Sequence, residues 1–152
     1  MENTLPKRRK LPHDRPPWAG DEAIYFITLC CDPRGRNQLC EAPVAWRLFE
    51  TIEFRHARGE MYVHLCVLMP DHLHGLMSFP SHVSMRKLIA DWKESASRRA
   101  HVVWQRDFFD HRLRHADSYT EKAYYIRMNP VRKGLVKSIE DWPYIWPSGD
   151  DG

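Results

Sequence analysis

The alternation of strand-like and helix-like segments predicts an α+β domain built on an antiparallel sheet. Runs rich in β-branched and aromatic residues, typical of strands, alternate with segments whose apolar residues recur every three or four positions, as in amphipathic helices. Their order along the chain is β-α-β-β-α-β, followed by one more helix. This is the split βαβ, ferredoxin-like pattern. We expect helices on one face of the sheet, and a tyrosine-bearing helix after it.

The first half of the pattern contains three strands and one helix. Residues 23–31 (AIYFITLCC) form a strand-like run that ends in a turn at residues 32–37. Residues 43–58 predict a helix, because Pro43 suits a first helical turn and Gly59 suits a helix end. Residues 61–68 and 72–79 are strand-like runs separated by Pro70 and Asp71, which predicts a hairpin.

The second half contains two helices around a short strand. Residues 84–100 predict a helix with Leu88, Ile89 and Trp92 turned inward, and residues 108–113 predict a strand. Residues 116–128 predict the last helix, which Asn129 and Pro130 should stop because proline disfavours a helical residue before it. An aromatic, proline-bearing tail follows at residues 142–147.

Length and composition predict a single folded domain with short ends. The chain has 152 residues, of which 43% are hydrophobic and 28% charged, values typical of a globular protein. Residues 1–20 are basic and proline-rich and predict a flexible arm with Lys7, Arg8 and Arg9. The domain is expected at residues 21–147 and a disordered tail at residues 148–152.

Charge and cysteine content narrow the class of protein. The formal net charge is +3, but residues 86–114 hold eight basic residues against four acidic ones. This segment suits either contact with phosphates or an ordinary solvated helix face. The four cysteines include no C-x-x-C pair, and no apolar run approaches the roughly 20 residues of a membrane span. We expect a cytoplasmic protein with reduced thiols.

Two histidines are the first candidate functional residues. His72 and His74 flank Leu73 on a predicted strand, so their side chains point to the same face, about 7 Å apart along the backbone. Two imidazoles on one face can share a metal ion, and they suit zinc, manganese and iron alike. Ordinary surface or core histidines remain the alternative, because the chain has nine.

The last predicted helix supplies a possible partner for the histidines. Successive helical residues rotate by about 100°, so Tyr125 and Asn129 lie on one side of the helix, about 40° apart. Tyr119, Ala123 and Ile126 form a neighbouring stripe suited to the core, and Tyr124 falls on the far side. Core packing is the alternative for Tyr125.

Several segments together resemble a known family. Residues 68–75 (LMPDHLHG) resemble the HUH motif (His, hydrophobic, His) of single-tyrosine, IS200-like transposases. Residues 104–111, residues 124–136 (YYIRMNPVRKGLV) and the tail motif at residues 141–143 resemble later segments of the same family, in the same order. The resemblance runs from about Ala23 to Trp146 and is closest to the REP-associated tyrosine transposases (RAYT proteins) of bacteria.

The resemblance implies a role for each candidate residue. The family's metal-binding histidines fall on His72 and His74, its third metal ligand on Asn129, and its nucleophilic tyrosine on Tyr125. It implies a DNA nuclease and strand transferase that cuts single-stranded or hairpin DNA with Mg²⁺ or Mn²⁺, through a 5′-phosphotyrosine intermediate. A monomer is favoured and a dimer stays open. Residues expected to bind DNA phosphates are Lys7, Arg8, Arg9, Arg86, Lys87, Lys93, Arg98 and Arg99.

Two other functions remain open from the sequence. The first is a non-catalytic protein that binds particular DNA sequences or hairpins on the same scaffold. The second is a small metalloenzyme acting on a soluble substrate, with His72 and His74 as zinc ligands. The sequence lacks an H-E-x-x-H or cysteine-containing zinc set, and this second function leaves Tyr125 unexplained. No residue is marked as a general base, although His111 and His115 are available.

Overall fold

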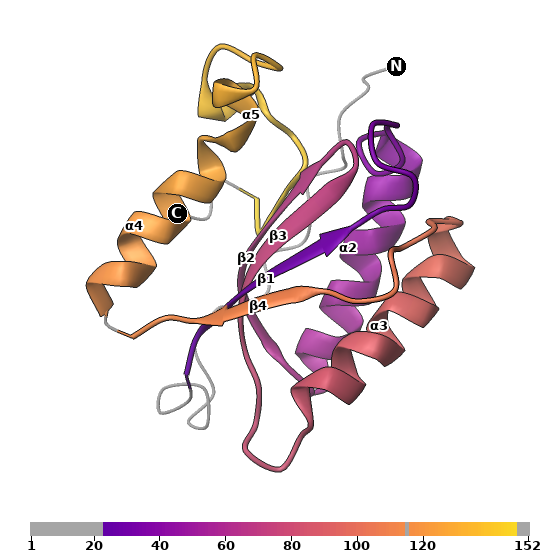
Figure 1. Ribbon diagram of the computed structural model, residues 1–152, viewed down its shortest axis with the longest axis vertical. Coiled ribbons are helices and arrows are strands. Elements are labelled where there is room, and N and C mark those ends of the chain that lie inside the picture. The colour runs from indigo at the N-terminus through magenta and orange to yellow at the C-terminus, as the bar shows by residue number, and fades with distance from the viewer. Residues whose placement is uncertain (1–22, 115, 149–152) are drawn as a thin grey trace.

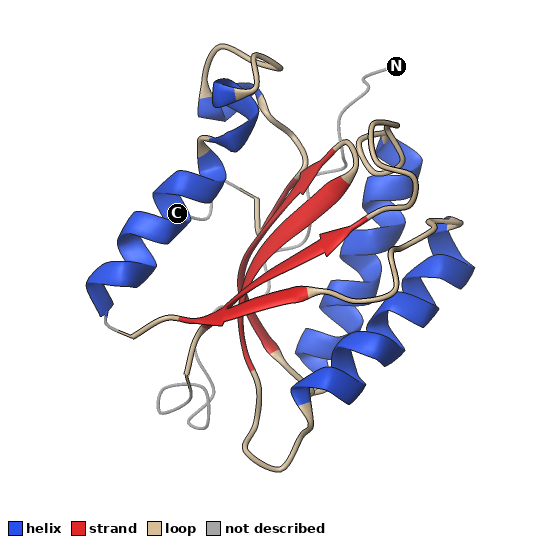
Figure 2. Cartoon of the chain, viewed as in Figure 1, coloured by secondary structure: helices blue, strands red, loops and turns tan. Residues whose placement is uncertain are grey.

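The computed structural model describes residues 23–114 and 116–148, which form one antiparallel sheet with helices on both faces (Figures 1 and 2). The predicted basic arm with Lys7, Arg8 and Arg9, and residues 149–152 of the predicted tail, lie outside the described residues. No described helix is long and apolar enough to cross a membrane.

The order of elements confirms the predicted α+β pattern. The strands are β1 (Tyr25–Cys30), β2 (Tyr62–Met69), β3 (His72–Ser78), β4 (Phe109–Arg112) and β5 (Ile145–Trp146). The helices are α2 (Ala42–Ala57), α3 (Met85–Ala100), α4 (Ala116–Arg127) and α5 (Asn129–Arg132), with a short 3-10 helix at Ile139–Asp141. Each predicted strand and helix is present, with ends shifted by at most two residues.

The sheet has the strand order β4-β1-β3-β2-β5, and neighbouring strands are antiparallel. Figure 1 shows α2 and α3 on one face of this sheet and α4 on the other. β5 was not predicted. It pairs only Ile145 and Trp146 with β2, and so short a strand between two prolines has no alternation to detect.

Two apolar cores, one on each face of the sheet, explain this layering. Leu73 and Met77 of β3 join the core under α2 and α3, where Trp92 of α3 donates a 2.9 Å hydrogen bond to Thr51 of α2. Leu76 joins a smaller core with Ala123 and Ile126 of α4. Side chains alternate along a strand, so the residues of β3 on the α4 side are His72, His74 and Leu76.

The helix predicted to stop at Asn129 and Pro130 does end there, but a second short helix follows it directly. α4 ends at Arg127, and α5 begins at Asn129 with Pro130 in its first turn. The amides of Met128 and Arg132 still donate to carbonyls four residues earlier, at 2.9 Å each. A proline is tolerated in a first helical turn, because the N–H that it lacks would have no partner there. The segment bearing Asn129 therefore follows α4 almost without interruption.

Candidate active site

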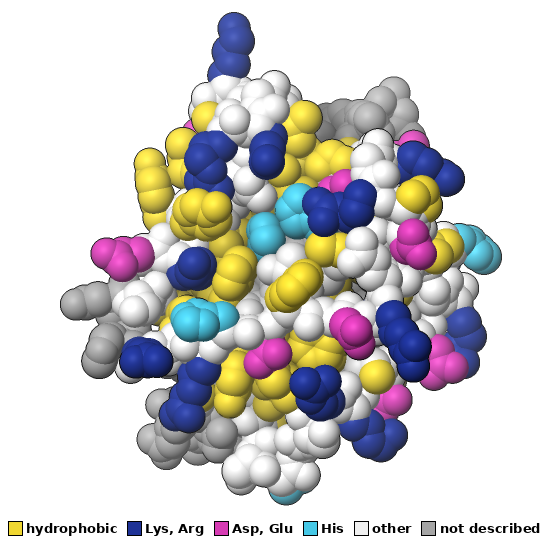
Figure 3. Space-filling view, viewed as in Figure 1, with side chains coloured by type: hydrophobic (Ala, Val, Ile, Leu, Met, Phe, Trp, Pro, Cys, Tyr) yellow, Lys and Arg dark blue, Asp and Glu magenta, His cyan; other side chains and the backbone are white. Residues whose placement is uncertain are grey.

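The two histidines lie side by side on the α4 face of the sheet, as the sequence predicted. In the register between β1 and β3, His72 lies opposite Cys30 and His74 opposite Thr28. The two imidazole rings have their centroids 4.8 Å apart. Both belong to β3, the central strand of the sheet, which gives the pair a rigid base. Figure 3 shows histidine side chains gathered near the middle of the view, with lysine and arginine side chains around them.

His72 is oriented by a carboxylate that is itself fixed. Nδ1 of His72 lies 2.9 Å from Oδ1 of Asp71. The other carboxylate oxygen, Oδ2, accepts hydrogen bonds from Nε of Arg34 at 2.9 Å and from the Gly35 amide at 2.8 Å. Partial burial opposes ionisation of Asp71, but hydrogen bonds from Arg34, His72 and Gly35 outweigh it and hold its pKa well below the usual range. The ionised carboxylate fixes the His72 ring, so that Nε2 is turned away from Asp71.

His74 is held in its neutral form. Its Nδ1 lies 2.9 Å from the Thr28 hydroxyl. Burial lowers the pKa of His74 to about 3, with further lowering by electrostatic interactions with His72, Lys122, Arg132 and Arg34. Neutral imidazole is the form that binds metal ions. In both histidines a hydrogen bond to Nδ1 fixes the ring, the usual arrangement of a metal-binding histidine.

The low pKa of His74 predicts a dependence of stability on pH. Below its ordinary pKa of 6.5, the unfolded chain takes up a proton at this position that the folded protein does not. The free energy of unfolding should therefore fall as the pH drops from 6.5 to 4.5. Over this pH range the wild type should lose about 1 to 2 kcal/mol more of its free energy of unfolding than the His74→Gln variant loses. Urea denaturation in EDTA at several pH values measures it, and parallel curves for the two proteins would contradict it.

Tyr125 lies on the accessible side of α4. Ala123 and Ile126 are buried against the sheet, as the predicted core stripe requires. Tyr125 is 51% exposed and Tyr124 62% exposed, so exposure alone does not separate them. Their contacts do. The guanidinium of Arg132 lies 3.9 Å from the centroid of the Tyr125 ring, and the ammonium of Lys122 lies 5.3 Å from it.

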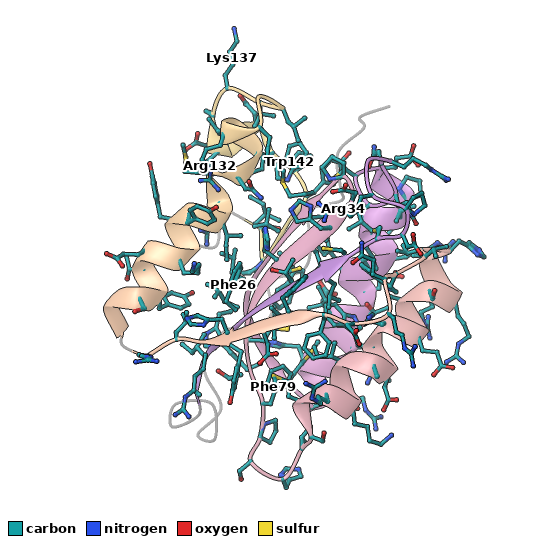
Figure 4. The ribbon with its side chains drawn as sticks, viewed as in Figure 1. Phe26, Arg34, Phe79, Arg132, Lys137 and Trp142 are labelled. Atoms are coloured by element: carbon teal, nitrogen blue, oxygen red, sulfur yellow. The ribbon has the colours of Figure 1, made fainter. Side chains whose placement is uncertain are left out.

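Lys122 and Phe26 connect the helix with the histidine pair. The Lys122 ammonium lies 4.7 Å from the centroid of the Phe26 ring, whose centroid in turn lies 5.2 Å from that of His74. Figure 4 shows Phe26 between α4 and the sheet, with Arg34 and Arg132 near the same end of the sheet. The tyrosine and the histidines therefore share one basic face.

Asn129 and Tyr125 both contact Arg132. Asn129 is only 6% exposed, and its Oδ1 accepts a hydrogen bond from Arg132 at 3.3 Å. The described residues contain no cluster of three or more His, Cys, Asp and Glu side chains that could hold a metal ion. In the structure the Asn129 amide oxygen contacts Arg132; the expected set of two imidazoles and this oxygen would tilt the preference toward Mn²⁺ or Mg²⁺. The two imidazoles, each held through a hydrogen bond at Nδ1, fit that role.

The basic residues predicted to bind DNA all lie on α3, as far as the structure describes them. Arg86, Lys87, Arg98 and Arg99 belong to α3, on the opposite face from the histidines (Figure 1). Lys93 is buried, and its ammonium donates to the carbonyls of Gln105, Arg106 and Asp107 at 2.8 to 3.2 Å. A buried ammonium bonded to three backbone carbonyls has a structural role, which argues against a phosphate contact by Lys93.

The basic residues nearest the site were missed in the sequence. Arg34, Lys122 and Arg132 all lie close enough to His74 to lower its pKa. Two of them had a signal, since Lys122 stands three residues before Tyr125 and Arg132 three residues after Asn129, on the same helical side. Arg34 had none, because it stands in a segment recognisable only as a turn.

A fixed histidine pair on an antiparallel sheet, facing a helix that carries a tyrosine, defines the HUH single-tyrosine class of transposases. The family model described as "Transposase IS200 like" matches residues 23–127. The chain therefore belongs to the IS200-like transposase family.

Individual relatives point to one branch of this family. The REP-associated tyrosine transposase of Escherichia coli (strain K12) is 30% identical over 83 residues, which are 51% of this chain and 49% of that protein. A protein of Haemophilus influenzae named for the same group is 29% identical over 80% of this chain and 77% of its own length. A solved REP-associated tyrosine transposase bound to a REP hairpin has a TM-score of 0.73 at 23% identity, covering 82% of this chain and 76% of its own.

Proposed function

We propose that this protein cuts and rejoins single-stranded or hairpin DNA with Tyr125 as its nucleophile. The observation that carries the proposal is the shared basic face, which holds two fixed histidines and an accessible tyrosine flanked by Lys122 and Arg132, with Lys122 and Phe26 between them. Membership in the transposase family supports the reaction class. The solved relative in complex with a REP hairpin supports hairpin DNA as the substrate.

In the proposed reaction the phenolic oxygen of Tyr125 attacks the phosphorus of a phosphodiester. The bond from phosphorus to the 3′-oxygen breaks, the phenol loses its proton, and the departing 3′-oxygen gains one. The products are a 5′-phosphotyrosine link and a free 3′-hydroxyl. The link keeps the energy of the phosphodiester, so a 3′-hydroxyl of another DNA end can reverse the step and be joined without ATP.

The residues around Tyr125 have distinct tasks in this proposal. Arg132 stacks on the tyrosine ring and holds it, while Lys122 supplies positive charge where the phosphate would lie. A divalent ion held by His72, His74 and Asn129 would neutralise charge on the phosphoryl oxygens. Asp71 fixes the His72 ring, and Thr28 fixes that of His74. Because Arg34 holds Asp71, its contribution is to the orientation of the pair.

The first test is incubation with labelled hairpin DNA and Mn²⁺, followed by denaturing electrophoresis. The proposal predicts a protein–DNA adduct that survives denaturation. A protein that only binds DNA would give a complex under native conditions and no adduct. A metalloenzyme for a soluble substrate would give neither.

The α3 residues allow a prediction about affinity. We propose that Arg86, Lys87, Arg98 and Arg99 contact phosphates of the hairpin distant from the cut, because α3 lies across the sheet from Tyr125. Arg98→Ala with Arg99→Ala should then weaken binding of all hairpins alike. The salt dependence of binding should flatten by a slope of roughly one per lost contact. Fluorescence anisotropy at several salt concentrations measures this, and an unchanged slope would show that both arginines are merely solvated.

A further inference from the structure

A cavity of about 400 Å³ lies between the end of β4 and α4. Its volume is within the range of small-molecule sites, roughly 300 to 1,000 Å³. The sheet side is formed by His111 and Leu113, and the helix side by Glu121, Lys122 and Tyr125, with Arg114 at the edge. The candidate metal ligands do not line it, so the cavity is distinct from the candidate metal site.

The cavity includes the proposed nucleophile, and Phe26 lies between its lining and His74. In the register between β1 and β4, His111 lies opposite Phe26. The Phe26 ring contacts both His74 and Lys122. Tyr125 and Lys122 therefore belong to the cavity and to the basic face at once. A DNA strand whose phosphate lies at Tyr125 would have its neighbouring nucleotide at the mouth of this cavity.

The lining suits a nucleotide better than a phosphate or an apolar ligand alone. Leu113 is only 9% exposed and gives an apolar floor, and the Tyr125 and His111 rings offer surfaces on which a base can stack. Arg114 and Lys122 supply positive charge for a phosphate. Glu121 is a carboxylate, which can only accept hydrogen bonds when ionised, so it favours a base that donates from an amino group.

An exposed aromatic residue of β4, on the same face as His111 of the cavity, suits an unpaired strand. Phe109 is 69% exposed on β4 and lies opposite Thr28, whose hydroxyl holds His74. Side chains opposite each other in a sheet share a face, so Phe109 extends the histidine face toward the edge of the sheet. An open aromatic ring on a basic face is a stacking surface for single-stranded bases.

We propose that this cavity binds one unpaired nucleotide next to the cut phosphate and selects a base with an exocyclic amino group. Glu121 accepts from that amino group, and Arg114 with Lys122 binds the nucleotide's phosphate. This inference rests on the proposed function, since the position of the nucleotide is set by Tyr125. Adenine, cytosine and guanine meet the requirement, whereas thymine has no exocyclic amino group.

Selection from a DNA library in EDTA, where binding can be followed without cleavage, tests this inference. The probe is a hairpin with eight randomised unpaired nucleotides on each side of the stem. Bound molecules are sequenced for the wild type, for Glu121→Gln, and for Glu94→Gln as a matched exposed glutamate on the opposite face of the sheet. In the wild type, one flanking position should favour amino-bearing bases over thymine by about tenfold. Glu121→Gln should reduce this preference below about twofold, and Glu94→Gln should leave it unchanged.

The outcomes separate this inference from the proposed chemistry. No preference in the wild type, or a preference retained in Glu121→Gln, overturns the cavity's role even if the protein forms a covalent adduct. A preference that Glu121→Gln removes supports the role even if no adduct forms, in which case only the chemistry fails. For the phosphate contact, Arg114→Ala should flatten the salt dependence by a slope of about 0.7 for single-stranded DNA, and an unchanged slope overturns that contact.

Discussion

Replacing Tyr125 with phenylalanine should abolish DNA cleavage while leaving DNA binding intact. The substitution removes one oxygen from an exposed side chain, and the remaining ring can still stack under Arg132. Folding should therefore change little. Without the attacking oxygen, cleavage should fall at least about 10³-fold, as expected for loss of a nucleophile. Cleavage of labelled hairpin DNA, with binding measured in parallel, gives both values.

Tyr124→Phe is the matched control for this experiment. Tyr124 is adjacent in sequence and equally accessible, but neither Lys122 nor Arg132 is found over its ring. Its variant should retain most of the cleavage. If the Tyr125 variant still cleaves, the proposed nucleophile is wrong. If only the Tyr124 variant loses cleavage, the reaction class survives and the assignment moves by one residue.

The second large effect should come from the histidine pair. His72→Ala removes a proposed metal ligand, so affinity for Mn²⁺ should fall at least about 100-fold and adduct formation should disappear. Asp71→Asn should have an intermediate effect of about 10- to 100-fold, because Asp71 only orients His72. Isothermal titration with Mn²⁺ measures these affinities.

His111→Ala is the control for the metal experiment. His111 is exposed on the same face of the sheet but lies at the cavity on β4 rather than beside the pair. Its affinity for Mn²⁺ should equal that of the wild type, and so should that of Tyr125→Phe. Equal metal affinity in His72→Ala and the wild type would exclude the histidine pair as the metal site.

Local periodicity explains which parts of the structure were predictable. Strand alternation placed His72 and His74 on one face, and helical rotation separated Ala123 and Ile126 from Tyr125. Both depend only on residues close in sequence. The contact of Arg34 with Asp71 spans 37 positions, and that of Lys122 with Phe26 joins α4 to β1. No periodic signal in the sequence encodes such long-range contacts. The charged neighbours of the histidines could therefore be identified only from the structure.

The basic helix shows where a count of charges misleads. The number of lysines and arginines in residues 86–114 does not indicate which face of the sheet their helix covers. Lys93 did carry a signal, because it continues the inward stripe of Ile89 and Trp92, and it is buried with them. Position on the helix was thus a better guide to this lysine than its charge.

The most direct test of the central claim is to find which residue carries the DNA after the reaction. The protein is incubated with hairpin DNA and Mn²⁺, then digested with nuclease and protease, and the modified peptide is sequenced by mass spectrometry. We expect a 5′-linked nucleotide on the oxygen of Tyr125, absent when EDTA replaces Mn²⁺. A nucleotide on any other residue, or cleaved DNA with no modified peptide, would contradict it.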